Sequence, residues 1–178
     1  ASMLKQRFLD AGLDDRIWPT QFGFRAKRCT EDAIIIARRR RELARAQKGG
    51  SVLLLALDWR KAFDSVNVDS MLSALQRKGI AGKYIRLLRY IMNGRQFFVE
   101  DMGFTSERRP QRSGISQGCT LSPLLFITVM SCMMEDAVAA VAQDDGGGDA
   151  LGAKKGAEAT DDLVTQMLIE HYVDTRVR

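Results

Sequence analysis

The stretch LDWRKAFDSV, at residues 57–66, follows an apolar run that begins at Val52. A short apolar run bounded by polar residues predicts a buried strand, here over residues 51–58. Asp58 stands where that strand ends, and an aromatic residue, Phe63, and a second acid, Asp64, follow closely. A carboxylate held by a rigid element can bind Mg²⁺ together with substrate phosphates. The stretch therefore predicts a metal-dependent site for phosphoryl transfer.

The composition is that of a globular protein with a modest basic excess. The chain has 178 residues, of which 46% are hydrophobic and 28% charged, and this suffices for one domain with a sizeable core. The net charge of +5 is compatible with a polyanionic partner and equally with ordinary surface charge. Arginines cluster at residues 38–41 and again at Arg108, Arg109 and Arg112.

The cysteines indicate a reducing compartment. Cys29, Cys119 and Cys132 form no CxxC pair and no even framework, so we expect no disulfides and a location inside the cell, in the nucleus or the cytoplasm. The single histidine, His171, cannot build a histidine-rich metal site. No uninterrupted apolar run approaches the ~18 residues of a transmembrane helix, so no membrane partner is expected. Because the sequence begins and ends abruptly, we expect it to be a piece of a longer protein.

Capping residues and apolar periodicity predict helices after a loop-rich segment over residues 1–29. The first expected helix is capped by Thr30 and runs to about Gln47, and the second is capped by Asn67 or Asp69 and ended by Gly79. The third has Tyr84 and Leu88 on its apolar stripe and is ended by Gly94. The fourth is strongly apolar, with Ser122 as N-cap, Pro123 at its first position and its end near Ala142.

Strands are expected at two further places. The first covers residues 96–100 and leads into a loop or a hairpin that carries Arg108, Arg109 and Pro110. The second lies within residues 163–173, after a flexible loop over residues 144–156. Helices and strands are mixed without a regular βαβ repeat, which favours an α+β fold.

Two more sequence blocks complete a pattern with residues 57–66. SGISQGCTLSPLLF, at residues 113–126, contains QGxxLSPxLF, and QFGFRAKRCTEDAI, at residues 21–34, contains GFRxxRxTxDAI. The three blocks, in this order, resemble those of reverse transcriptases, in particular the enzymes of non-LTR (LINE-type) retrotransposons. The resemblance covers residues 21 to about 135 of the chain.

This resemblance implies an RNA-directed DNA polymerase with the right-hand polymerase fold. The fingers would occupy about residues 1–50, and residues 51–178 would form mainly the palm with some fingers elements. An antiparallel palm sheet backed by helices is expected, with no thumb among these residues. The implied partners are an RNA template, a DNA primer and deoxynucleoside triphosphates. The implied cofactor is a pair of Mg²⁺ ions, with Mn²⁺ as an alternative.

The resemblance also implies roles for residues of the first two blocks. Asp58 would be a catalytic metal ligand, and the backbone carbonyl of Trp59 a further ligand. Phe63 would be the aromatic gate that excludes a 2′-hydroxyl, although a core aromatic is the competing interpretation. Gln117 and Gly118 would line the incoming nucleotide, because glycine allows close backbone approach.

Cations of the upstream block are candidates for phosphate binding, since guanidinium groups match phosphate oxygens. Arg25 and Arg28 are the preferred residues, with Lys27 beside them, and a solvated loop is the alternative. The arginines at residues 38–41 could follow the template backbone or form a solvated face. Asp64 is expected to be structural, paired with a nearby arginine.

The third motif of the family, an aromatic, any residue and two aspartates, is not intact. YVDT at residues 172–175 keeps the aromatic and one acid, so Asp174 is the preferred second catalytic carboxylate and metal ligand. ATDDLV at residues 159–164 keeps both acids, Asp161 and Asp162, but lacks the aromatic. A third alternative is that the motif is absent. The rival function is therefore a decayed or non-catalytic relative that still binds RNA.

Overall fold

The computed structural model describes residues 1–48, 50, 52, 54 and 57–144. The chain divides into two compact units, which we describe separately. Unit 1 comprises Ala1–Arg16 and Arg60–Val129, and unit 2 comprises Ile17–Trp59 and Met130–Arg178.

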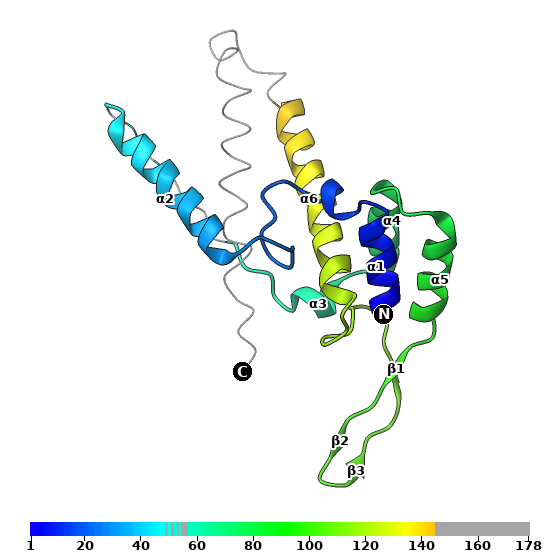
Figure 1. The fold of residues 1–178 in the computed structure, drawn as a ribbon. Helices are drawn as coiled ribbons and strands as arrows, with labels where there is room; N and C mark the ends of the chain where they lie inside the picture. Colours follow the sequence, from blue (N-terminus) through cyan, green and yellow to red (C-terminus); the bar gives the residue numbers. More distant parts are fainter. Residues whose placement is uncertain (49, 51, 53, 55–56, 145–178) are drawn as a thin grey trace. The chain divides into compact units, whose positions relative to one another are not determined.

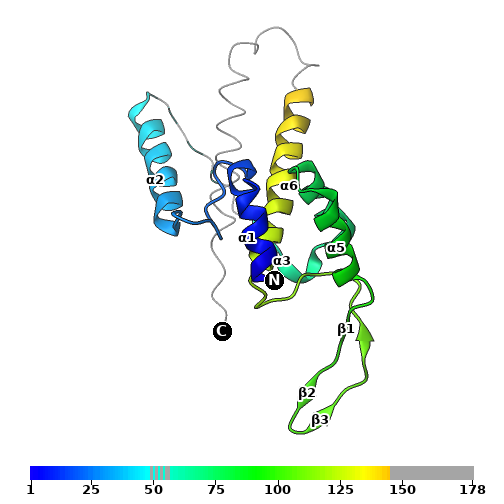
Figure 2. The same ribbon diagram turned by 45° about the vertical axis from the view of Figure 1, so that its right-hand side comes forward.

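Helices form the core of unit 1. They are α1 (Ser2–Asp10), the 3₁₀ turn η1 (Asp14–Arg16), the short α3 (Ala62–Ser65), α4 (Val68–Arg77), α5 (Gly82–Met92) and the beginning of α6 (Ser122–Asp144). Helices α4 and α5 lie side by side (Figures 1 and 2). Phe8 of α1 packs edge-on against Tyr84 of α5, with 5.8 Å between the ring centroids. The fully buried side chains of this core are Phe8, Leu13, Met71, Leu72, Leu75, Leu88, Ile115, Leu125, Ile127 and Thr128.

The predicted cap of the second expected helix is confirmed. Asn67 is the N-cap of α4, and its side chain accepts a hydrogen bond from the backbone N–H of Ser70 at 3.0 Å. The competing cap, Asp69, lies in the first turn and pairs with Arg89 of α5 at 2.7 Å. Both side chains are exposed, so this ion pair contributes little to stability.

The expectation of loops throughout residues 1–29 was wrong at the N-terminus. Residues Ser2–Asp10 form α1, which buries Phe8 and partly buries Leu4 and Leu9. Leu4 and Phe8 are four residues apart and therefore share one face of a helix. The apolar stripe is too short to stand out in the sequence, and its burial depends on α5.

The expected hairpin forms, but its strands are short. Strand β1 (Gln96–Phe97) pairs antiparallel with β4 (Arg109–Pro110), and β2 (Glu100–Asp101) pairs antiparallel with β3 (Phe104–Thr105). Met102 and Gly103 both have positive φ, as the two-residue turn of a twisted hairpin requires. The hairpin projects away from α1, α4 and α5 (Figure 1).

In unit 2, α2 (Thr30–Ala46) begins one residue earlier than expected, because Thr30 is its first residue rather than its cap. Cys29 is the N-cap, and its backbone N–H donates to Asp32 Oδ2 at 3.0 Å, so the pair forms a capping box. Ala33 is the buried residue of this helix. A loop precedes α2, and the backbone N–H of Trp18 in it donates to Ser131 Oγ of α6 at 2.8 Å.

The predicted apolar helix is confirmed as α6, and Leu124, Leu125 and Ile127 are buried. It also starts differently from the prediction. Ser122 is its first residue, and the carbonyl of Leu121 accepts the first helical bond, from Leu125 at 3.1 Å. By length and composition, its 19 residues Ser122–Ala140 could cross a membrane, although Glu135 and Asp136 interrupt the apolar run. Half of that window is buried in the structure, and a core helix meets the same criterion.

The buried strand predicted before Asp58 is not found among the described residues. Val52, Leu54 and Leu57 lie outside any strand and are exposed, Leu54 to 59%. A strand needs a hydrogen-bonded neighbour, and the four strands of the described part of the chain pair with one another. Residues 51, 53, 55 and 56 lie outside the described residues, as do the strand predicted within 163–173 and nearly all of the loop predicted at 144–156.

Helices with small antiparallel strands agree with the predicted α+β class. The assignment of fingers to about residues 1–50 and of palm to the rest stays a prediction.

Candidate functional site

The first sequence block continues from Asp58 into α3 through a strained turn. Lys61 precedes α3 with φ +53°, in the left-handed region that residues with a Cβ seldom occupy. Two hydrogen bonds hold the turn: the backbone N–H of Ser65 donates to the carbonyl of Lys61 at 2.8 Å, and its hydroxyl donates to the carbonyl of Arg60 at 3.2 Å. The turn fixes the start of the helix that carries Phe63.

Backbone hydrogen bonds fasten the second sequence block to the first. The N–H of Ile115 donates to the carbonyl of Phe63 at 3.0 Å, and the N–H of Gly114 donates to the carbonyl of Val66 at 2.8 Å. The hydroxyl of Ser113 donates to the carbonyl of Asp64 at 3.1 Å. We call residues 113–115 the strap. The strap holds the two motifs together within unit 1, and it engages Asp64 through its backbone rather than through the ion pair we expected.

Gly114 allows this close approach. Its φ is +85°, and a Cβ at this position would lie 2.9 Å from both Cα and O of Asp64. Arg95, at the base of the hairpin, secures the strap from the other side: its Nη2 donates to the carbonyl of Gly114 at 2.7 Å, and its Nε donates to that of Met92 at 3.3 Å. Burial lowers the pKa of the Arg95 guanidinium from its ordinary high value, which leaves it charged.

Phe63, the predicted sugar gate, is half-buried. Its ring stacks on that of Phe126 in α6, with 4.9 Å between centroids and 17° between planes. One face of the ring is therefore fixed by packing. This contact is compatible with both interpretations of Phe63. A core aromatic would pack in this way, and a sugar gate would need the same rigidity to exclude a 2′-hydroxyl.

Gln117 and Gly118 lie on the exposed loop between the strap and α6. Gly118 has φ +84°, and nothing lies within 4 Å of the position that a Cβ would take. The left-handed backbone conformation, rather than crowding, therefore explains why a glycine suits this position.

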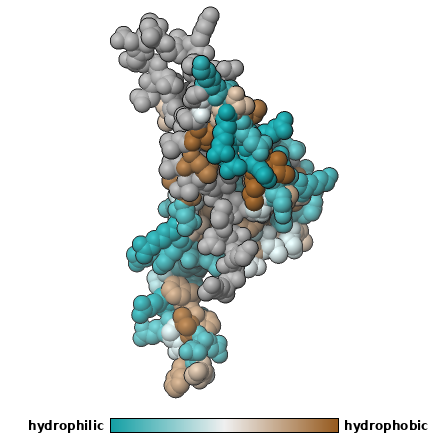
Figure 3. All heavy atoms as spheres, turned by 90° about the vertical axis from the view of Figure 1, so that its left-hand side faces the viewer, coloured by the Kyte–Doolittle hydropathy of each residue, from teal (hydrophilic) through white to brown (hydrophobic). Residues whose placement is uncertain are grey.

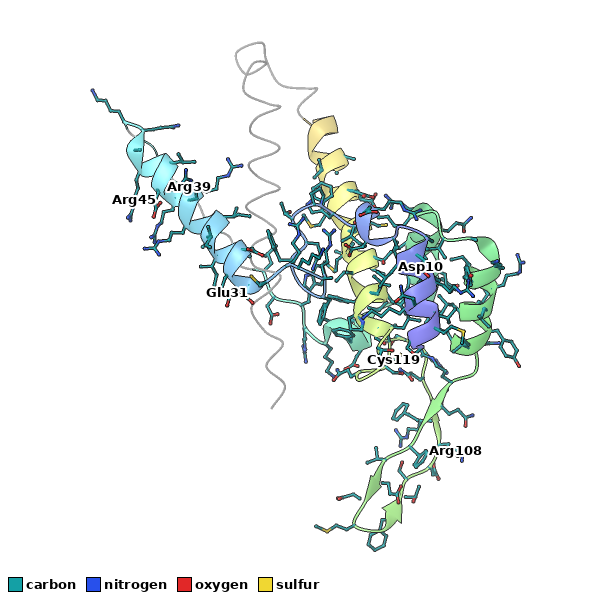
Figure 4. The ribbon with its side chains drawn as sticks, in the orientation of Figure 1. Asp10, Glu31, Arg39, Arg45, Arg108 and Cys119 are labelled. Atoms are coloured by element: carbon teal, nitrogen blue, oxygen red, sulfur yellow. The ribbon has the colours of Figure 1, made fainter. Side chains whose placement is uncertain are left out.

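Cys119 received no role from sequence reasoning beyond the search for disulfides, and all three cysteines are free. It lies just before α6 (Figure 4). Burial raises the pKa of the Cys119 thiol, but hydrogen bonds from the backbone N–H groups of Leu121 and Ser122 and from the Ser122 hydroxyl outweigh it, so the pKa lies below its ordinary value. A cysteine shortly before a Ser-Pro helix start is the sequence signal that could have identified this environment.

Asp58 and Trp59 belong to unit 2, and both are exposed. Their hard oxygen donors, a carboxylate and a backbone carbonyl, suit Mg²⁺. In the part of the chain that the structure describes, no group of three or more His, Cys, Asp or Glu side chains could hold a metal ion. The proposed second carboxylates, Asp174 and its competitors Asp161 and Asp162, lie outside the described residues.

The candidate phosphate-binding arginines of unit 2 contact their own loop. Arg25 Nη1 donates to the carbonyl of Trp18 at 3.4 Å, and the Arg28 guanidinium lies over the ring of Phe22, 5.4 Å from its centroid. Phe24 and Lys27 have φ values of +61° and +60°, so the loop turns sharply twice. These contacts shape the loop and leave Arg28 exposed.

The structure thus brings Phe63, Gln117 and Gly118 into unit 1, whereas Asp58, Trp59, Arg25 and Arg28 belong to unit 2. The part in unit 1 consists of a packed aromatic ring, a strap of backbone hydrogen bonds and an open, glycine-containing loop. The strap and the ring packing fix these residues relative to one another within unit 1.

Comparison with known proteins identifies the family of the chain. A family model described as reverse transcriptase (RNA-dependent DNA polymerase) matches residues 1–171. The match extends beyond the three sequence blocks in both directions, and it includes α1, Asp161 and Asp162 but not Asp174. No solved structure matches the chain at a significant level. Because the family model covers most of its length, the chain belongs to the reverse transcriptase family of RNA-directed DNA polymerases.

Proposed function

We propose that the chain catalyses RNA-templated addition of deoxynucleotides to a primer 3′-end, as the reverse transcriptase of a non-LTR retrotransposon. The observation that carries this proposal is the strap, which joins the gate motif around Phe63 to the motif that contains Gln117 and Gly118. The non-LTR assignment rests on the particular residues found in the blocks at residues 21–34 and 113–126.

Each site residue has a stated part in the proposed reaction. Asp58 and the carbonyl of Trp59 would hold Mg²⁺, with Mn²⁺ as an alternative, and Asp174 would supply the second carboxylate. When bound, a pair of such ions aligns the 3′-hydroxyl with the α-phosphate and neutralises charge on the leaving pyrophosphate. Phe63 would exclude ribonucleotides, Gln117 and Gly118 would position the incoming nucleotide, and Arg25 and Arg28 would bind its phosphates.

Primer extension on an RNA template tests the proposal. Asp58→Ala removes a proposed metal ligand, so we expect extension in Mg²⁺ to fall by more than about 100-fold, the scale of losing a group that stabilises transition-state charge. Asp10→Ala is the matched control, because Asp10 is an exposed acid of α1 in unit 1 (Figure 4), and it should leave extension unchanged. Extension that survives Asp58→Ala would contradict the assignment.

The second carboxylate is tested in the same assay. Asp174→Ala should abolish extension if YVDT is the third motif, whereas the double change Asp161→Ala with Asp162→Ala should abolish it if the competing segment supplies the acids. Because the family match covers the second segment and not the first, both variants are needed.

The altered third motif supports an alternative function, an inactive relative that binds RNA. YVDT has one aspartate where the family has two, and one carboxylate alone binds Mg²⁺ weakly. RNA binding without extension, unchanged by Asp58→Ala, would establish this alternative. The three free cysteines fit a reducing environment, so we place the protein inside the cell, in the nucleus or the cytoplasm.

A further inference from the structure

The hairpin exposes more apolar surface than its size can stabilise alone. We call residues 95–112 the ribbon. All residues from 96 to 110 are exposed, including Phe97, Phe98 and Phe104. At the bottom of Figure 3 the ribbon shows brown and teal residues next to one another. A two-stranded ribbon with both faces in water is marginally stable, so a partner that covers the rings would stabilise it.

The basic half of the ribbon carries two phenylalanines, each beside an arginine. Phe97 pairs across the strands with Arg109, and the next ring, Phe98, lies under the guanidinium of Arg108 at 5.7 Å. Phe98 directly follows β1 and Arg108 directly precedes β4, so the two pairs are neighbours along the ribbon. The rings remain 48% and 47% exposed, so each keeps surface available for stacking.

Charge is separated along the ribbon. The half nearest the helices, residues 95–99 and 108–112, holds four arginines and no acid, whereas residues 100–107 at the far end hold Glu100, Asp101 and Glu107 and no base. Arg95 is engaged by the strap. Arg108, Arg109 and Arg112 are exposed, and Arg108 is labelled on the ribbon in Figure 4.

We propose that this basic half of the ribbon binds single-stranded nucleic acid, which in the proposed function is the RNA template. Phosphates would contact the arginines, and unpaired bases would stack on the two phenylalanine rings, as bases do on aromatic platforms. A single strand fits better than a duplex, because only unpaired bases expose their faces. The acid-free basic half favours a polyanion over a protein partner. The identification as template rests on the proposed function, whereas binding itself does not.

Fluorescence anisotropy with a labelled single-stranded RNA of mixed sequence, in EDTA, tests this inference without catalysis. Phe97→Ala and Phe98→Ala should each weaken binding by about 5- to 150-fold, the range found for loss of one stacked base. Arg108→Ala and Arg109→Ala should each reduce the slope of log K against log salt by about 0.7, as expected for one lost phosphate contact on a single strand.

The matched controls remove similar groups elsewhere. Phe104→Ala deletes a ring from the acidic end, and Arg86→Ala deletes an exposed arginine from α5, so both should bind RNA as the unmodified chain does. Because ribbon residues 96–110 lie outside the core, no variant should change the urea midpoint of the helices. That unchanged midpoint separates lost binding from lost folding.

Three outcomes would overturn the inference. RNA binding that is unaffected by the ribbon variants places the nucleic acid elsewhere and leaves the proposed function intact. Loss of self-association by Phe97→Ala in sedimentation, with RNA binding unchanged, assigns the ribbon to a second copy of the chain. Absence of RNA binding by the unmodified chain removes both the inference and the proposed function.

Discussion

Gly114 and Gly118 have nearly the same backbone conformation, with φ of +85° and +84°, but different surroundings. An added Cβ costs about 1–2 kcal/mol in the left-handed region wherever it stands. At Gly118 that is the whole cost, because the space is open. At Gly114 the Cβ would also meet the Asp64 backbone at 2.9 Å, and backbone cannot move aside as a side chain end can.

Comparing alanine substitutions at these two glycines therefore separates the energetic cost of the left-handed backbone from the cost of a steric clash. We expect Gly118→Ala to lower the free energy of unfolding by about 1–2 kcal/mol, and Gly114→Ala to lower it by more than that, because the strap must shift. Urea denaturation followed by circular dichroism measures both. Equal losses would mean that the strap is not held against α3 as described.

At the scale of elements, the N-terminus of α2 depends on a titratable capping box. Two hydrogen bonds lower the pKa of Asp32 below its ordinary value. The larger effect comes from the bond with the Cys29 backbone N–H, and the smaller from the bond with the Cys29 thiol. A carboxyl whose pKa is lowered by folding stabilises the folded state above its unfolded pKa, and this contribution is lost as pH falls through the lowered folded pKa.

The expected result is loss of helicity of α2 in acid, beginning below the ordinary carboxyl pKa. Asp32→Asn should remove that pH-dependent step in circular dichroism while keeping the side-chain shape. Asp10→Asn, at an exposed acid near the end of α1, serves as the control and should retain it. A step that persists in Asp32→Asn would show that another carboxyl causes it.

Elements whose signals are local were predicted well, and elements that need distant partners were not. Asn67 caps α4 through a contact three residues away, so its sequence alone indicates the cap. The segment before Asp58 is apolar, but strand pairing is a property of two segments, and apolar composition carries no information about the partner.

The same distinction holds at the candidate site. The motifs identified Phe63, Gln117 and Gly118, and the structure places all three in unit 1. Arg95 was missed, because its bond to Gly114 spans 19 residues and begins in a segment without a motif. The hydrogen bonds of the strap also connect segments about 50 residues apart, as Ser113 and Asp64 show.

For the whole molecule, the division into units shows that distant segments share one core. Unit 1 joins residues 1–16 to residues 60–129, and Phe8 is the fully buried side chain that α1 contributes to it. The ring contacts Tyr84, 76 positions along the chain from it, and the carbonyl of Phe8 accepts the backbone N–H of Leu13 at 3.1 Å. The N-terminal helix is therefore part of the core of unit 1 rather than an appendage.

Phe8→Ala should consequently lower the free energy of unfolding by about 3–5 kcal/mol, the usual cost of deleting a buried aromatic ring. Met3→Ala changes the same helix at a residue that is 76% exposed, and it should alter stability by less than about 0.5 kcal/mol. Urea unfolding monitored by tyrosine fluorescence and by circular dichroism reports both variants, since Tyr84 lies against the ring. Similar, small losses for the two variants would show that α1 does not pack on α5, and that the core of unit 1 begins only after residue 60.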